Sequence, residues 1–509
     1  MTGIKRLTLI VALWAIATAT GQQRAVAQTK QTRPPARAAT PRTSPTRPAE
    51  LEALIVDARS APAEFAADVL LRLVESHKIA ERAWQRALLE EAFRTAGGAQ
   101  QPLKRRIVPG LNYAYTREDY QARAFQLNLN TLSLRLRAVN ALLKIDKSKA
   151  RALFSEIPRK LPLAPRTCDD ALIYDLLDYY TTLNQIIATT FSPEEKARDE
   201  DVLFTQSYVE EMSAPEQVFY TAALVTRAGD SPARLAPLVH AYSSALRKIE
   251  ADARSFTADS MNYGMTLTIL LDFCQRHEIS PDELLEAFRT FFVKHMGASR
   301  CAESAKTPDR WLNNFNRQLN ELALNQPSLA PIKPEEITPA KIEGAAHLTP
   351  FFSTPIARSL FRTAQELRFG LADEPEPDED RVDPKRGEKL LVWLNAMADW
   401  RAGGETSEAD YFDQKCVLYQ LLLEAGPNEG PAGTTLLAEY VAFLRQPARQ
   451  QESRAGWLLH VQRLLSSTRF GAGDARARLR AALASSGEPV LRLYAGIQRA
   501  RPQMGTHLP

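Results

Sequence analysis

The chain has 509 residues, of which 45% are hydrophobic and 24% are charged, and these proportions exclude a protein that is disordered throughout. The formal net charge of +4 is unevenly spread: residues 1–49 hold eight of the 64 basic residues and none of the 60 acidic ones, so residues 50–509 carry a net charge of −4. A mildly acidic folded part lacks the basic surface that a nucleic-acid-binding protein needs, and we expect no nucleic acid among its partners.

Residues 1–27 are typical of a secretory signal peptide. Lys5 and Arg6 precede an apolar run at 7–19, and residues 25–27 read Ala-Val-Ala, which fits the cleavage site. An uncleaved anchor helix is the alternative, but the apolar run is shorter than the roughly 20 residues that a membrane-spanning helix needs. The sequence predicts cleavage after Ala27 and export, to the periplasm or the extracellular space, of a soluble protein without a membrane span.

Residues 28–49 have the composition of a disordered linker. They contain five prolines and five basic residues, with no acid and no large apolar side chain. Such a segment cannot bury enough apolar surface to fold by itself. Contact between this cationic segment and a polyanionic envelope surface is the alternative to a solvated tether.

Apolar residues recur at helical spacing through residues 50–326 and predict a helical array. We expect helices at 51–59, 62–74, 79–95, 118–143, 147–157, 169–190 and 193–212, and further helices that begin near residues 215, 232, 257, 281 and 308. The helices that begin near residues 257 and 281 form a predicted hairpin at 261–301. Its turn, Ser280-Pro281-Asp282-Glu283, has the form of a capping box.

Helix starts of this kind recur along the chain. A serine or threonine followed closely by proline stands at Ser192, Ser213, Ser231, Ser280 and Thr307. One helix per roughly 20 to 25 residues is the spacing of antiparallel helix pairs, as in α-solenoids and α/α toroids, although no fixed repeat signature can be written. The sequence leaves an open solenoid and a closed toroid as alternatives.

The second half of the chain begins with a proline-rich strap. Residues 327–385 contain that strap, one helix at 355–369 and the segment Asp373 to Asp380, in which six of eight residues are acidic and which we expect to form a flexible loop. Residues 386–509 form a smaller C-terminal helical part, with helices predicted at 387–401, 408–424, 434–445, 449–466, 474–485 and 488–499. No strand pair is expected, so the predicted fold class is all-α.

Cys274, His277, His295 and Cys301 resemble a zinc-binding set. Cysteine and histidine are preferred zinc ligands. In the predicted hairpin, however, His295 lies about 14 residues along the second helix, which is about 20 Å from the turn. Because four ligands must lie within about 2.3 Å of one ion, we predict that these residues line the core and hold no metal.

The same distance argues against a disulfide between Cys274 and Cys301, because a disulfide needs Cα atoms within about 7 Å. Cys274 and Cys416 fall on apolar helix faces, whereas Cys168 and Cys301 fall in predicted turns. If an exported protein with four cysteines forms one bridge, Cys168 and Cys301 are the pair that we predict.

A polar face on the helix near residue 311 is the candidate binding groove. Asn313, Asn316 and Asn320 align with Arg310 on one side, where they could line a groove for sugars or peptides. A simple solvated helix face is the alternative reading of the same pattern.

No catalytic residues emerge from the sequence. Asp175 and Asp178 point away from the apolar face of their helix, and phosphate-loop, dinucleotide, serine-hydrolase, zinc-protease and haem-attachment motifs are absent. We expect no cofactor. The leading hypothesis is an exported binding or scaffold protein with a protein partner. The alternatives are an α/α-toroid hydrolase or lyase that acts on glycan through Asp or Glu acid-base chemistry, and a purely structural envelope component.

Overall fold

The structure is a computed structural model. It describes residues 47–100, 123–168, 176–228, 231–255, 260–301, 312–313, 316–317, 331–338, 340–344, 350–369, 384–403, 407–425, 431–445, 454–466, 479, 481–485 and 487–500. The predicted signal peptide, most of the predicted linker at 28–49 and the acidic segment Asp373 to Asp380 lie outside these residues.

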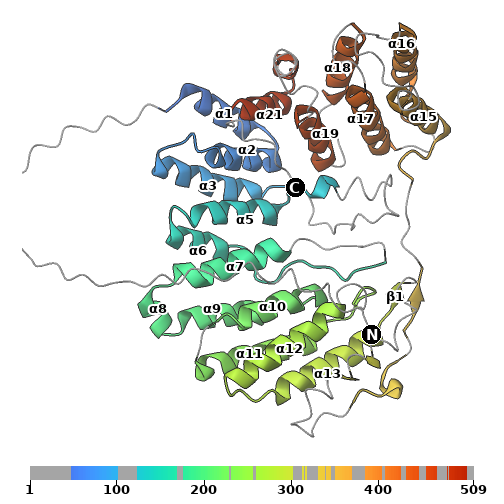
Figure 1. The fold of residues 1–509 in the computed structure, drawn as a ribbon. Helices are drawn as coiled ribbons and strands as arrows, with labels where there is room; N and C mark the ends of the chain where they lie inside the picture. Colours follow the sequence, from blue (N-terminus) through green and yellow to red (C-terminus); the bar gives the residue numbers. More distant parts are fainter. Residues whose placement is uncertain are drawn as a thin grey trace, which may run out of the picture. The chain divides into compact units, whose positions relative to one another are not determined.

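The described part of the chain is mostly α-helical, which confirms the predicted all-α class (Figure 1). None of its helices is long and apolar enough to cross a membrane. The α-helices are α1 (Ala49–Ser60), α2 (Ala63–Glu75), α3 (Arg82–Ala96), α5 (Thr131–Leu142), α6 (Lys147–Ser155), α7 (Leu176–Thr190), α8 (Pro193–Ala197), α9 (Glu200–Val209), α10 (Val218–Val225), α11 (Pro232–Lys248), α12 (Ser260–Arg276), α13 (Asp282–Met296), α15 (Pro355–Phe369), α16 (Pro384–Asp399), α17 (Glu408–Ala425), α18 (Pro431–Leu444), α19 (Arg454–Ser466) and α21 (Pro489–Ala500).

Two helices that the sequence predicts as continuous are broken. The predicted helix at 118–143 is interrupted at Asn128, whose φ is +54°, and α5 begins only after Asn130, whose side chain caps it. The predicted helix at 193–212 is interrupted at Asp199, where φ is +59°. Asn and Asp tolerate this left-handed conformation better than other residues with a side chain, so a single residue can end a helix without glycine or proline.

The predicted helix caps are only partly realised. At α8, Ser192 and Glu195 form the reciprocal capping box that the sequence indicates, with bonds of 3.2 and 2.7 Å. At α13, the Ser280 hydroxyl bonds Asp282 instead, and Glu283 turns to His240 and Arg247 on α11. An ion pair with a neighbouring helix therefore replaces the local cap there.

Most helices that are neighbours in the chain between α1 and α11 contact one another, and beyond them α10 contacts α12 and α11 contacts α13. Among these contacts, α2 packs on α3, α3 on α5, α6 on α7, α10 on α11, and α11 on α13. In the C-terminal half, α15 contacts α16 and α17, and α17 contacts α18 and α19. Two hydrophobic cores result: the second is built mainly from α9 to α13, and the first joins α1 to α7 with α15 to α21.

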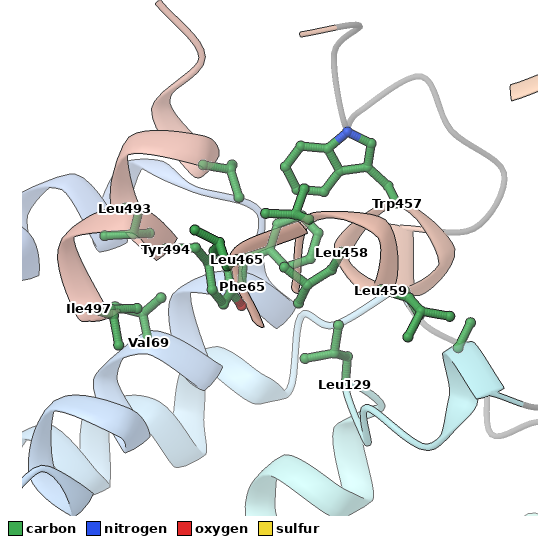
Figure 2. Packing of buried hydrophobic residues seen from close by; sticks show 14 of the residues in the cluster. Phe65, Val69, Leu129, Trp457, Leu458, Leu459, Leu465, Leu493, Tyr494 and Ile497 are labelled. Atoms are coloured by element: carbon green, nitrogen blue, oxygen red, sulfur yellow. The ribbon is translucent and has the colours of Figure 1, made fainter. Parts of the chain in front are cut away.

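The C-terminal helices α19 and α21 pack against α2, near the other end of the sequence (Figure 2). The Phe65 ring of α2 lies 5.8 Å from the Trp457 ring and 6.1 Å from the Tyr494 ring. Arg454 donates a 2.8 Å hydrogen bond to Glu64. The predicted domain boundaries after residues 326 and 385 stay predictions, and the contacts show that residues on either side of both share one core.

A short parallel strand pair departs from the expectation of no strands. β1 (Arg300–Cys301) pairs with β2 (Ile342–Glu343), with Arg300 opposite Ile342. Strands of two residues are too short to show an alternating apolar pattern, so periodicity does not predict them. The pair fastens the strap to the end of the α12–α13 hairpin.

Candidate functional site

Of the polar face predicted near residue 311, the structure describes Asn313 and Asn316. Asn313 is exposed, but the Asn316 side chain donates to the Ile332 carbonyl at 2.8 Å and accepts from the Ile332 N–H at 2.9 Å. Arg310 and Asn320 lie outside the described residues. The Asn316 amide is thus used to hold the strap.

The structure brings Cys168 and Cys301 together as a disulfide, with their Cα atoms 5.4 Å apart. Cys274 and Cys416 are buried free cysteines, and burial raises the pKa of Cys274 to about 11. His295 is also buried, with its ring stacked 3.8 Å from the Phe291 ring. Within the described ranges no three His, Cys, Asp or Glu side chains gather as metal ligands would.

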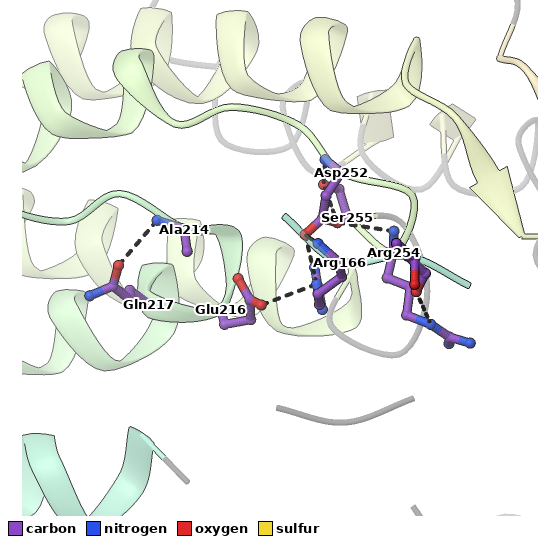
Figure 3. Close-up of polar contacts among 8 residues, drawn as sticks. Arg166, Ala214, Glu216, Gln217, Asp252, Arg254 and Ser255 are labelled. Atoms are coloured by element: carbon purple, nitrogen blue, oxygen red, sulfur yellow. Dashed lines mark hydrogen bonds and ion pairs between the residues drawn. The ribbon is translucent and has the colours of Figure 1, made fainter. Parts of the chain in front are cut away.

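A buried ion cluster is centred on Arg166 (Figure 3), and its neighbour Arg254 donates to the carbonyl of the disulfide-bonded Cys168. Arg166 lies 2.8 Å from Asp252 and 3.1 Å from Glu216, and all three residues are less than 9% exposed. Burial would raise the pKa of Asp252, but the charge of Arg166 and its hydrogen bonds outweigh burial and lower it. Arg254 donates to the Thr167 carbonyl at 3.2 Å. The cluster fastens the segment before Cys168 to the loop after α11, and it is closed to a substrate.

A second buried cluster is centred on Asp68 of α2, which is fully buried. Its carboxylate lies 2.7 Å from both Arg72 and Arg137, and it accepts a 2.7 Å hydrogen bond from the Tyr494 hydroxyl. Burial opposes ionisation of Asp68, but the charges of the two arginines outweigh it and lower its pKa. The paired charges thus join α2, α5 and α21.

Lys415 of α17 is a buried cation in the C-terminal half. It is 4% exposed, and burial lowers its pKa to about 8. Its ammonium donates to the Tyr411 hydroxyl at 2.8 Å and to the Trp400 carbonyl at 3.3 Å, and it lies 5.2 Å from the centre of the Phe443 ring. Such enclosure makes it a core residue, not an accessible nucleophile.

A groove between α6 and α9 is the candidate binding site. It has a volume of about 520 Å³, within the range of sites that bind small molecules or side chains. Its walls combine two arginines, three serines and one glutamate with apolar and aromatic side chains. The lining residues are Ser148, Arg151, Ala152, Ser155, Arg159, Phe191, Glu200, Leu203, Phe204 and Ser207.

The wall at Arg151 is held rigidly by the start of α8. Glu195, fixed by the capping box with Ser192, accepts a 2.5 Å hydrogen bond from Arg151. The hydrogen bond from Arg151 is the main reason that the pKa of Glu195 falls to about 2. The Arg151 guanidinium also lies 4.3 Å from the centre of the Phe191 ring. A cap that is visible in the sequence therefore positions a groove residue 44 positions earlier.

The opposite wall comes from α9, whose side chains face in several directions. Val202 belongs to the second core, and Phe204 packs against the first. Leu203 between them is 61% exposed and lines the groove. Because α9 is apolar on more than one face, its hydrophobic periodicity does not reveal which residue is left at the surface.

Comparisons of the chain with protein-family models, with curated proteins and with solved structures found no match. The chemistry of the groove must therefore be read from its own side chains. Among the lining residues Glu200 is the single carboxylate, whereas glycoside hydrolysis generally uses two. The faces of Phe191 and Phe204 are engaged as well, because Phe191 packs on Arg151 and meets Phe204 at 5.4 Å.

The groove residues carry no recognisable pattern in the sequence. Arg151, Arg159 and Leu203 belong to no motif, and they come from α6, from the segment after it and from α9, which begins after Asp199. The capping box at Ser192 is the one part of the arrangement that the sequence indicates. A capping box does not show which distant basic side chain its glutamate will bind.

Proposed function

We propose that the protein is an exported, non-catalytic binding or scaffold protein. In this proposal the successive helices form an array of antiparallel pairs with a smaller C-terminal helical part, and the array presents the groove between α6 and α9 to a protein partner. The sequential helix contacts support the array, and the predicted signal peptide supports export.

The observation that carries the proposal is the exposed apolar side of the groove. Leu203 is 61% exposed beside Phe204 and Phe191. An apolar centre rimmed by arginine and serine side chains has the composition of a protein-binding surface more than of a solvated helix face. Burying the Leu203 side chain would stabilise a complex by about 1–2 kcal/mol.

A capture experiment tests the proposal. The tagged protein is expressed in the cell that exports it, treated with a short crosslinker and purified with its partners. We expect a partner that wild type retains and that Leu203→Glu loses, because the introduced carboxylate would have to be desolvated at the contact.

Val56→Glu is the matched control. Val56 on α1 is 62% exposed, so the two substitutions place the same charge at sites of equal exposure. A partner that is lost equally in both variants, or retained equally in both, would show that the groove is not the binding surface.

A further inference from the structure

We propose that the groove between α6 and α9 recognises an acidic peptide segment, in which a large apolar side chain is flanked by a carboxylate. This inference rests on the proposed function and deepens it, because it assigns the chemical class of the ligand. Three properties of the lining support it: its apolar centre, the charge left at one end, and the hydrogen-bonding state of its serines.

The apolar centre accommodates a branched side chain better than a sugar ring. Leu203 is exposed, and the Phe191 and Phe204 rings are fixed by each other in an edge contact. The Arg151 guanidinium occupies one face of Phe191. Ring edges and a leucine make dispersion contacts with aliphatic groups, whereas a sugar stacks on an open aromatic face.

Arg159 carries the charge that remains uncompensated at the groove. Arg151 is paired with Glu195 at 2.5 Å, and Glu200 is paired with Arg198 at 2.8 Å. Arg159 is exposed, and its described surroundings offer the Tyr208 ring at 5.5 Å rather than a carboxylate. The exposed Lys160 adjoins it and adds to the positive charge. A carboxylate on the ligand would complete this end of the groove.

The serines are disposed to accept hydrogen bonds. The Ser155 hydroxyl donates to the Arg151 carbonyl at 3.0 Å, and the Ser207 hydroxyl donates to the Phe204 carbonyl at 2.7 Å. The Ser207 oxygen therefore keeps lone pairs for an incoming donor such as a peptide N–H, whereas the Ser155 oxygen also meets the Tyr208 hydroxyl. The two helices span about 13–15 Å at 1.5 Å per residue, which corresponds to about four residues of extended peptide.

Peptide selection on the full chain tests the inference. A random hexapeptide display library is selected against wild type and counter-selected against Leu203→Glu, and the enriched peptides are synthesised for binding measurements by fluorescence anisotropy. We expect enrichment of sequences with Leu, Ile or Phe next to Asp or Glu. Arg159→Glu should weaken their binding about tenfold, which is about 1.4 kcal/mol, and should change the preferred flanking residue to Lys or Arg.

Arg362→Glu is the control for charge. The Arg362 side chain on α15 is 75% exposed and does not line the groove, so its reversal should leave the affinity within twofold. Enriched peptides without an acidic residue, or affinities that Arg159→Glu leaves unchanged, would overturn the inference. If partner capture nevertheless depends on Leu203, the groove remains the binding surface and only the acidic specificity fails. If capture does not depend on Leu203, the proposed function itself fails.

Discussion

At the residue scale, the least predictable feature is the placement of charge in the core. Glu64 and Asp68 lie four residues apart on α2 and are fully buried beside Phe65 and Val69. The apolar spacing of α2 predicts its helix correctly, but it gives no reason to bury two acids. Arg72, one turn away, is a local partner of Asp68, but Arg454 and Tyr494 lie 390 and 426 residues away from the acids that they contact. The sequence around α2 gives no indication of these distant partners.

Asp68→Asn should be strongly destabilising. The substitution keeps the shape of the side chain but leaves Arg72 without its nearest counter-charge and Arg137 with Glu75 alone, and breaking a buried ion pair in this way costs up to about 3–5 kcal/mol. Urea unfolding monitored by circular dichroism measures the loss. Asp57→Asn, at an exposed position of α1, should stay within about 0.5 kcal/mol of wild type. A similarly small effect for Asp68→Asn would contradict the role assigned to the cluster.

His295 predicts a pH dependence of stability. Burial lowers its pKa to about 3, against the opposing charge of Asp252, so the unfolded chain binds a proton at this residue between pH 6.5 and 3 and the folded protein does not. The contribution of neutral His295 to the free energy of unfolding is therefore fully present above about pH 6.5 and is lost as the pH falls toward 3. Between pH 7 and 4.5 the loss from this residue is about 2–3 kcal/mol.

The measurement compares wild type with His295→Leu by urea unfolding at both pH values. The variant should lose about 2–3 kcal/mol less than wild type on acidification. Equal losses in the two proteins would show that His295 does not remain neutral in the folded state.

At the scale of elements, periodicity predicted where helices occur better than where they end. The breaks at Asn128 and Asp199 depend on a left-handed conformation that either residue can adopt but that neither requires. Capping patterns showed the same limit: the box at Ser192 formed, whereas Glu283 of the similar box at Ser280 bonded α11 instead. Contacts with other helices decide between such alternatives. The break at Asp199 is one of them, and it sets the start of α9 beside the groove.

The disulfide between Cys168 and Cys301 links distant elements of the chain, and its formation can be tested directly. We propose that the bridge forms in the exported protein, where it would join positions that are 133 residues apart and hold the segment before α7 to the end of the α12–α13 hairpin. In denaturant without reductant, thiol labelling should find two reactive cysteines, Cys274 and Cys416, and reduction should raise the number to four.

Replacing both bridged cysteines with alanine should lower the free energy of unfolding by about 2–4 kcal/mol. Four reactive thiols before reduction would rule the bridge out. Two thiols belonging to another pair of cysteines, identified by mass spectrometry, would rule out this connectivity.

At the scale of the whole molecule, the all-α class followed from helical periodicity alone, but the joining of the first and last helices did not. Phe65 of α2 meets Trp457 of α19 and Tyr494 of α21, so residues from both ends of the chain build one core. An apolar face predicts that a helix is buried on that side, but it does not show which other helix packs against it. The groove has the same origin, because α6 and α9 supply its walls from separate parts of the chain.

The central claim is that the groove between α6 and α9 meets a partner, and photo-crosslinking in the exporting cell tests it most directly. Benzoylphenylalanine is introduced at Ala152, an exposed lining residue of α6, and separately at Val56 as the control. We predict a discrete crosslinked adduct from position 152 that position 56 does not give. Absence of an adduct at 152, or the same adducts from both positions, would contradict the account.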